Sequence, residues 1–269
     1  EEAEELIRAK LTQATAKTTE ALPALVELVT ARSEGNAFYL EELLNYIGDQ
    51  GIDVGDTGAV AKVELPESLH SLVLSRIDTL PEAPRRTIKV ASVVGRAFDV
   101  ATLVRVYAEL GSVDEVGAQL RRLKTLDLVV PDRGDDSYLF KHAVTHEVTY
   151  ESMPYSFRAM LHDRVGGDLE ATSPDTVEQN LDLLAHHYWL SENVGKKREY
   201  LVRAGEAAKA NYANDTAIDY LERAAPLLPP ADRWRVTREV GEVREVLGDW
   251  PGAEGTYRVR RGDTLALIA

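Results

Sequence analysis

The chain has 269 residues, 44% of them hydrophobic, and its 31 basic and 45 acidic side chains give a formal net charge of −14 at pH 7. The apolar content suffices for more than one hydrophobic core, whereas the acidic balance argues against a surface built mainly to hold nucleic acid or anionic lipid. The sequence contains no cysteine, which excludes disulfides, thiolate zinc sites and cysteine nucleophiles. No apolar run approaches the roughly 18 residues of a membrane span, so we expect a cytoplasmic protein without a membrane span.

The first 80 residues carry a helical pattern. Apolar residues recur three and four apart in three stretches, 22–29, 40–47 and 69–77, as in amphipathic helices. Glu1 is not preceded by Met and the pattern starts at once, so we expect a piece of a longer protein. Glycines interrupt the periodicity over 48–60 and predict a surface loop, and Pro66 predicts the start of the next helix.

Residues 84–140 predict three short helices and a β-hairpin. The helices are expected at 88–94, 101–110 and 116–126, separated by turns at Gly95 and Gly111. Strands at 128–130 and 138–140 flank a turn-rich stretch. Three helices followed by a hairpin indicate a winged-helix domain.

From Tyr150 onward the pattern is helical and contains an internal repeat. A small residue, an Ala and a large apolar residue recur 36 residues later: Gly205, Ala217 and Leu221, then Gly241, Ala253 and Tyr257. This spacing is typical of tetratricopeptide (TPR) units, in which a small residue lets two helices cross closely. Residues 257–269 also resemble the opening of a LysM peptidoglycan-binding module, but the repeat register favours a further helical repeat.

Residues able to carry chemistry are few. The chain has no Walker-type phosphate loop and no serine-nucleophile elbow, so we expect no enzymatic activity from it. His142 and His146, four apart on a predicted helix, could offer two imidazoles to a metal, although packing is the preferred interpretation because no third ligand is marked. Of the adjacent His186 and His187, one is expected to be packed and the other solvated.

Two sets of charged residues allow both a functional and a structural interpretation. The adjacent Glu41 and Glu42 are expected to form a solvated helix face rather than an acid/base pair. On the third helix of the predicted winged helix, four side chains could contact DNA: Gln119, Arg121, Arg122 and Lys124. The acidity of the chain favours a packing surface with exposed basic residues instead.

Seven stretches, in fixed order, resemble the region downstream of the ATP-binding core in STAND-class signalling ATPases, especially those associated with bacterial adenylate or guanylate cyclases and LuxR-type regulators. The fullest match is RSEGNAFYLEEL at 32–43, and shorter ones lie at 65–69, 75–80, 91–98, 138–144, 158–162 and 184–188. The resemblance implies a mainly α fold with a helical lid (1–80), a winged-helix domain with a small β-hairpin (81–152) and TPR-like α-helical repeats (153–269).

The resemblance also implies nucleotide-facing residues. A Gly-Asn-Pro turn in the family's lid touches adenine, which assigns Gly35, Asn36 and Ala37 to this contact, although Ala37 stands where the family has Pro. A His after the last strand of the winged helix senses the β-phosphate of ADP in related ATPases, and His142 occupies that place; packing of its ring against a neighbouring helix is the equal alternative. ATP or ADP with Mg²⁺ would be bound by the parent protein and not by this chain alone.

The leading hypothesis is therefore a regulatory and scaffolding fragment of a multidomain signalling ATPase, which switches with nucleotide and binds protein partners through its repeats. The alternative is a DNA-binding transcriptional regulator that acts through the winged helix. The parent protein could be an ATPase or a class III nucleotide cyclase.

Overall fold

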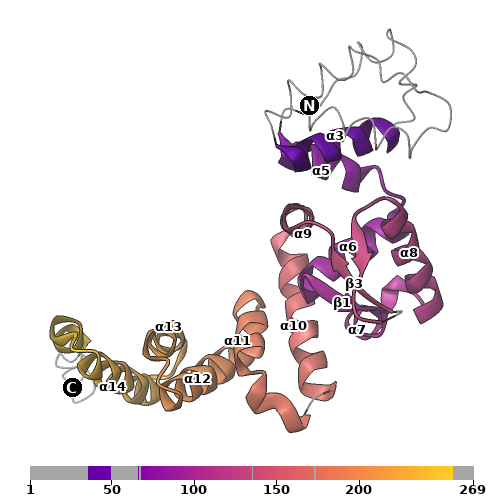
Figure 1. Cartoon of the computed structure of the whole chain (residues 1–269). Coiled ribbons are helices and arrows are strands. Elements are labelled where there is room, and N and C mark those ends of the chain that lie inside the picture. Colours follow the sequence, from indigo (N-terminus) through magenta and orange to yellow (C-terminus); the bar gives the residue numbers. More distant parts are fainter. Residues whose placement is uncertain (1–35, 50–65, 67, 135, 173, 257–269) are drawn as a thin grey trace. The chain divides into compact units, whose positions relative to one another are not determined.

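A computed structural model describes residues 36–49, 66, 68–134, 136–172 and 174–256 of the chain (Figure 1). The chain divides into two compact units: Glu1–Val104 with Ala108–Met153, and Arg105–Tyr107 with Pro154–Ala269. Each unit is mainly helical, and the first also contains a small antiparallel sheet. In the part of the chain that is described, every helix is too short or too polar to cross a bilayer.

Helix α3 (Ala37–Asp49) opens the described part of the first unit. Its start is fixed by Asn36, whose Oδ1 accepts the N–H groups of Phe38 and Tyr39 at 3.1 Å each, as is usual for an N-cap Asn. The helix contains the predicted stretch 40–47 and buries its apolar side chains: Leu40, Leu43, Leu44 and Ile47. It runs to Asp49, so the loop predicted from residue 48 begins too early; the predicted helix over 22–29 lies outside the described residues.

Helix α5 (Leu69–Asp78) begins at Leu69 because Ser68 forms a capping box with Ser71. A helix does begin near Pro66, as predicted, but Pro66 precedes the cap and does not belong to the first helical turn. Val73 and Ile77 of α5 pack against Val148 of α9 (Ala143–Glu151). This apolar contact joins the beginning of the unit to its end.

Between α5 and α9 lie the elements of the predicted three-helix and hairpin region, in this order: α6 (Glu82–Val94), β1 (Ala97–Asp99), α7 (Val100–Val106), η1 (Ala108–Leu110), α8 (Val113–Thr125), β2 (Val129–Pro131) and β3 (Ser137–Phe140). The hairpin is confirmed, because β3 pairs antiparallel with β2. The helix expected over 101–110 is interrupted, and its last part is a 3₁₀ turn. Ser112 and Glu115 form a capping box that starts α8, and hydrogen bonds from Ser112 lower the pKa of Glu115.

Strand β1 was not predicted. It pairs antiparallel with β3, with Phe98 opposite Tyr138, and the sheet order is β1-β3-β2. A strand of three residues is too short to show an alternating pattern. Phe98 nevertheless anchors it, because its ring is 5% exposed and meets Phe140 edge-on with 5.6 Å between the ring centroids.

The second unit is a succession of helices, each of which packs against the next along the chain. They are α10 (Tyr155–Thr172), η2 (Pro174–Gln179), α11 (Leu181–Leu190), α12 (Val194–Ala210), α13 (Asn214–Ala224), η3 (Ala225–Leu227) and α14 (Pro230–Val246), followed by helical residues 250–256. This neighbour-to-neighbour packing is what stacked helical repeats require.

The close helix crossing expected at Gly205 is present between α12 and α13. A Cβ added at Gly205 would lie 2.7 Å from Cγ and Cδ2 of Leu221, so a larger residue would push the helices apart. In the second predicted repeat Gly241 and Ala253 are buried, and Tyr257 lies outside the described residues. The tetratricopeptide assignment itself stays a prediction.

A second close approach joins α10 to α11. A Cβ at Gly166 would lie 2.6 Å from Cζ of Tyr188, and the Tyr188 ring stacks on Tyr200 with 5.1 Å between centroids. The neighbouring Gly167 has no atom within 4 Å of such a Cβ. Two adjacent glycines of one helix therefore differ only in what they face.

This difference gives a matched pair of substitutions. Gly166→Ala should lower the free energy of unfolding by about 1–3 kcal/mol, because the Tyr188 ring must shift. Gly167→Ala should leave it unchanged or raise it by up to about 1 kcal/mol through helix propensity. Urea unfolding followed by far-ultraviolet circular dichroism measures both, and equal stabilities would contradict the described packing.

Candidate functional site

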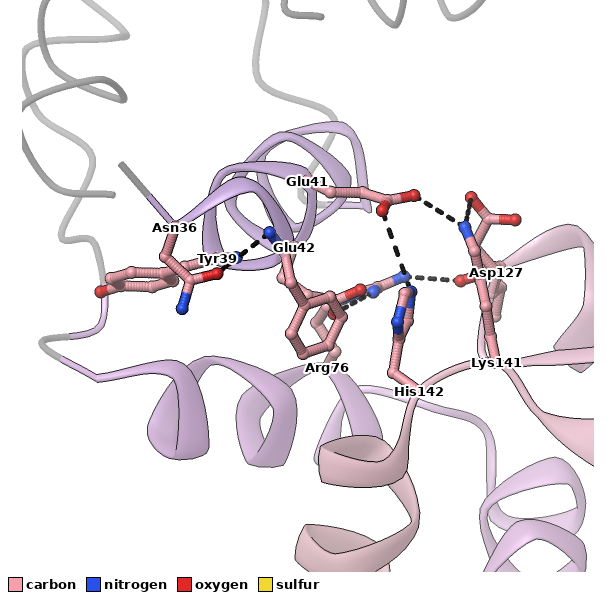
Figure 2. A network of polar contacts seen from close by, with 10 residues as sticks. Asn36, Tyr39, Glu41, Glu42, Arg76, Asp127, Lys141 and His142 are labelled. Atoms are coloured by element: carbon pink, nitrogen blue, oxygen red, sulfur yellow. Dashed lines mark hydrogen bonds and ion pairs between the residues drawn. The ribbon is translucent and has the colours of Figure 1, made fainter. Parts of the chain in front are cut away.

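A cluster of charged side chains lies where α3 meets the rest of the first unit (Figure 2). We call it the docking cluster, and its members are Glu41, Glu42, Arg76, Asp127, Lys141 and His142. Glu41 and Glu42 are neighbours on α3, so their side chains leave the helix about 100° apart. Glu42 consequently points at Arg76 of α5, and Glu41 points at the segment that joins β3 to α9.

The inner contact of the docking cluster is a buried ion pair. Arg76 Nη1 lies 2.5 Å from Glu42 Oε2, and the two side chains are 2% and 1% exposed. Arg76 Nη2 also donates to the carbonyl oxygen of Leu126, just after α8, at 2.6 Å. One guanidinium thus joins α3, α5 and the end of α8. Charges buried this deeply are tolerated only when they are paired and hydrogen-bonded.

The outer contact is a partly exposed set of charges. Lys141 Nζ lies 2.7 Å from Glu41 Oε1 and 3.1 Å from Asp127 Oδ2. His142 Nε2 lies 3.8 Å from Glu41 Oε2, the other oxygen of the same carboxylate. A single carboxylate of α3 therefore faces two basic side chains that are adjacent in the sequence.

His142 occupies an unusual environment. Its ring lies 4.0 Å, centroid to centroid, from the ring of Phe38, and its Nε2 atom is buried without a hydrogen-bond partner. Burial lowers the pKa of His142, an effect that the nearby Glu41 carboxylate opposes. The imidazole is thus held close to a carboxylate with one nitrogen still able to take up a hydrogen bond.

The residues assigned to nucleotide contact are partly brought together. Asn36 and Ala37 are exposed at the start of α3, and His142 is the N-cap residue of α9 but makes no capping bond with its side chain. Phe38 connects these two places through its contact with His142. Gly35 lies outside the described residues.

Sequence reasoning missed most of the docking cluster. The expected solvated face is wrong for Glu42, whose side chain is buried. The available signal was Arg76, which falls between Val73 and Ile77 on the apolar stripe of α5. A cation on such a stripe requires a buried partner.

The other histidines have separate surroundings. His146 Nε2 donates to the carbonyl oxygen of Ser92 at 2.9 Å, so His142 and His146 do not share a site. Across the described residues, no three or more His, Cys, Asp or Glu side chains are grouped so as to hold a metal ion. His187 is buried and His186 exposed, which confirms the expected division between these neighbours.

His187 pairs with His162 of α10 in the interior of the second unit. Their Nδ1 atoms are 2.9 Å apart, so one ring donates to the other, and both residues are 2% exposed. Burial lowers the pKa of His162 to about 4 and that of His187 to about 3. Both imidazoles are therefore neutral in the folded chain at neutral pH.

The buried pair should make the chain sensitive to mild acid. The unfolded histidines take up protons below pH 6.5, whereas the folded ones resist until about pH 4, so stability is lost as the pH falls through this window. Between pH 7.5 and pH 5 the free energy of unfolding should fall in the unsubstituted chain and in a His162→Leu, His187→Leu double variant. The fall should be larger in the unsubstituted chain by about 2–4 kcal/mol. Urea midpoints across pH test this, and parallel pH profiles would contradict it.

The four predicted DNA-contacting side chains differ in accessibility. Gln119 accepts a hydrogen bond from Thr87 and donates to the carbonyl oxygen of Leu110 at 3.4 Å. Arg121, Arg122 and Lys124 are exposed on α8. The amide best suited to read a base edge is therefore committed to packing within the unit.

The docking cluster contains cations that can bind an oxyanion, and carboxylates of the same cluster form ion pairs with them. Comparisons of the chain with protein-family models, with curated proteins and with solved structures find no match. The contacts of α3 are therefore the observations from which we infer a function.

The buried ion pair gives a direct test of the docking. Arg76→Met should lower the free energy of unfolding by about 3–5 kcal/mol, because it leaves the Glu42 carboxylate buried without its partner. Combining it with Glu42→Leu should recover most of that loss. Denaturant unfolding measures both variants.

The control is Arg86→Met, which removes the i,i+4 pair with Glu82 on the exposed face of α6. This variant should change stability by less than about 1 kcal/mol. If Arg76→Met proved equally mild, the Arg76–Glu42 pair would not be what fixes α3.

Proposed function

We propose that this chain is a regulatory and scaffolding part of a multidomain signalling ATPase of the STAND class. The observation that carries the proposal is the approach of the start of α3 to His142. Asn36 and Ala37 lead directly into Phe38, whose ring lies against that of His142. Phe38 thus links the two segments to which the resemblance assigns adenine and phosphate contact.

The order of elements supports a winged-helix assignment for residues 81–152. Helix α6, strand β1, helices α7 and α8 and strands β2 and β3 follow one another, with β3 in the centre of the sheet. A short strand after the first helix, which completes the sheet begun by the hairpin, suits this assignment better than a hairpin alone. In this proposal α3 belongs to a lid that docks on the winged helix.

The docking cluster suits contact with a phosphate. His142 offers a buried nitrogen that lacks a hydrogen-bond partner, and Lys141 adds a permanent cation beside it. In the parent protein a core outside this chain would hold ATP or ADP with Mg²⁺, and the bound nucleotide would present its phosphates to this surface. Asn36 and Ala37 would meet the base, without the flat proline ring that the family places there.

The helices of the second unit are proposed to bind a protein partner. Large aromatic side chains are exposed on them: Trp189, Trp234 and Trp250. Trp189 is covered by two cations, Lys197 at 5.2 Å and Arg223 at 5.4 Å from its ring centroid. Exposed Trp beside Arg is enriched in the energetically important parts of protein interfaces.

A DNA-binding regulator is the second candidate, and the exposed Arg121, Arg122 and Lys124 favour it. Against it, Gln119 is engaged in packing, and the exposed Asp114 and Glu115 open the same helix. Any ATPase or class III cyclase chemistry of the parent protein is, in this proposal, carried outside this chain.

The proposal is tested by hydrogen exchange on the full-length protein. With ADP bound, amides at the start of α3 and at residues 141–146 should exchange at least about tenfold more slowly than with ATP, because closing the lid raises the cost of local opening. The chain alone should bind ADP weakly or not at all by calorimetry. Tight binding by the chain alone, or identical exchange with both nucleotides, would overturn the proposal.

A further inference from the structure

The two carboxylates of α3 make contacts of different kinds. Glu42 is 1% exposed and faces a cation that is 2% exposed, whereas Glu41 is 19% exposed and faces two basic side chains, Lys141 and His142, with 24% and 26% exposure. Removing Glu42 from Arg76 would leave a bare charge in the interior. Removing Glu41 from Lys141 would expose an ammonium group that water already reaches.

The geometry of Glu41 resembles that of a bound oxyanion. Its Oε1 lies 2.7 Å from Lys141 Nζ, and its Oε2 lies 3.8 Å from His142 Nε2. Two oxygens of one anionic group thus face two neighbouring basic side chains, as two oxygens of a phosphate would. The longer distance leaves His142 Nε2 without a hydrogen bond, so the carboxylate fills this position incompletely.

We infer that Glu41 is an intramolecular competitor for a phosphate-type oxyanion at Lys141 and His142. This rests on the proposed function, which it deepens by naming what occupies the phosphate-sensing position when no phosphate is there. Glu41 holds α3 against the β3–α9 segment in the absence of ligand, and a phosphate displaces its side chain.

Displacement does not require α3 to leave the unit. The Arg76–Glu42 pair and its hydrogen bond to the Leu126 carbonyl hold the helix independently of Glu41. Asp127, 3.1 Å from Lys141 Nζ, keeps that ammonium in place when Glu41 turns away. A side-chain rotation of Glu41 is therefore sufficient to exchange one anion for another.

The test uses the 269-residue chain and pyrophosphate as the probe. The imidazole signal of His142 is followed by nuclear magnetic resonance and assigned with His142→Gln. In Glu41→Gln the pyrophosphate concentration at half-saturation should fall at least about tenfold below that of the unsubstituted chain, because the competing anion is gone. Adding Lys141→Met to Glu41→Gln should reverse this gain, since it removes the ammonium group that would contact the anion.

The matched control is Glu82→Gln, which removes the same charge from the exposed pair with Arg86 in the same unit. It should leave the pyrophosphate response of His142 unchanged, and circular dichroism checks that each variant is folded. An equal response in Glu41→Gln and Glu82→Gln, or a gain that survives Lys141→Met, would overturn the inference.

This experiment separates the inference from the proposed function. A gain in Glu41→Gln without nucleotide-dependent exchange in the full-length protein would support the competitor and contradict the ATPase assignment. Nucleotide-dependent exchange in the full-length protein without a gain in Glu41→Gln would support the ATPase assignment and contradict the role of Glu41 as a competitor.

Discussion

The buried ion pair between Arg76 and Glu42 determines how the first unit is assembled. It joins α3, α5 and the residue after α8 through one guanidinium. Apolar packing alone would allow α3 to slide or rotate on α5, because dispersion contacts have little directional preference. A planar guanidinium that must satisfy a carboxylate and a carbonyl oxygen allows one position. The positions of Phe38 and Glu41 relative to His142 follow from it.

Helical geometry gives the two adjacent glutamates opposite surroundings. Glu42 lies on the buried side of α3, between Leu40 and Leu43 in an apolar stretch, and Glu41 lies at its rim. An ion pair that excludes water is stable because breaking it is costly, and an ion pair that water reaches exchanges readily. The docking cluster therefore combines a fixed contact with an exchangeable one within two residues of sequence.

The sequence predicted the elements better than the contacts between them. Periodic apolar residues located α3, α5, α6 and α8, and turn residues located the β2–β3 hairpin. Strand β1 escaped because its three residues show no period. The role of Glu42 escaped because the residue that buries it, Arg76, lies 34 positions away in the chain, and only the folded structure brings such residues together. His142 was assigned to phosphate contact by resemblance alone, and its contact with Phe38 is a result of the fold.

The cations of the two units have different surroundings, and this difference affects what each unit could bind. In the second unit, cations pair with carboxylates of other helices, as Arg235 of α14 does with Glu206 of α12 and Arg244 of α14 with Glu222 of α13. These contacts stiffen the stack but occupy the charges they join. The exposed aromatic side chains Trp234 and Trp250 are left for the partner contact that we propose for this unit. In the first unit Lys141 and His142 face the partly exposed carboxylate of Glu41, which we propose an anion replaces. Our proposals accordingly assign sensitivity to small anions to the first unit and partner contact to the second.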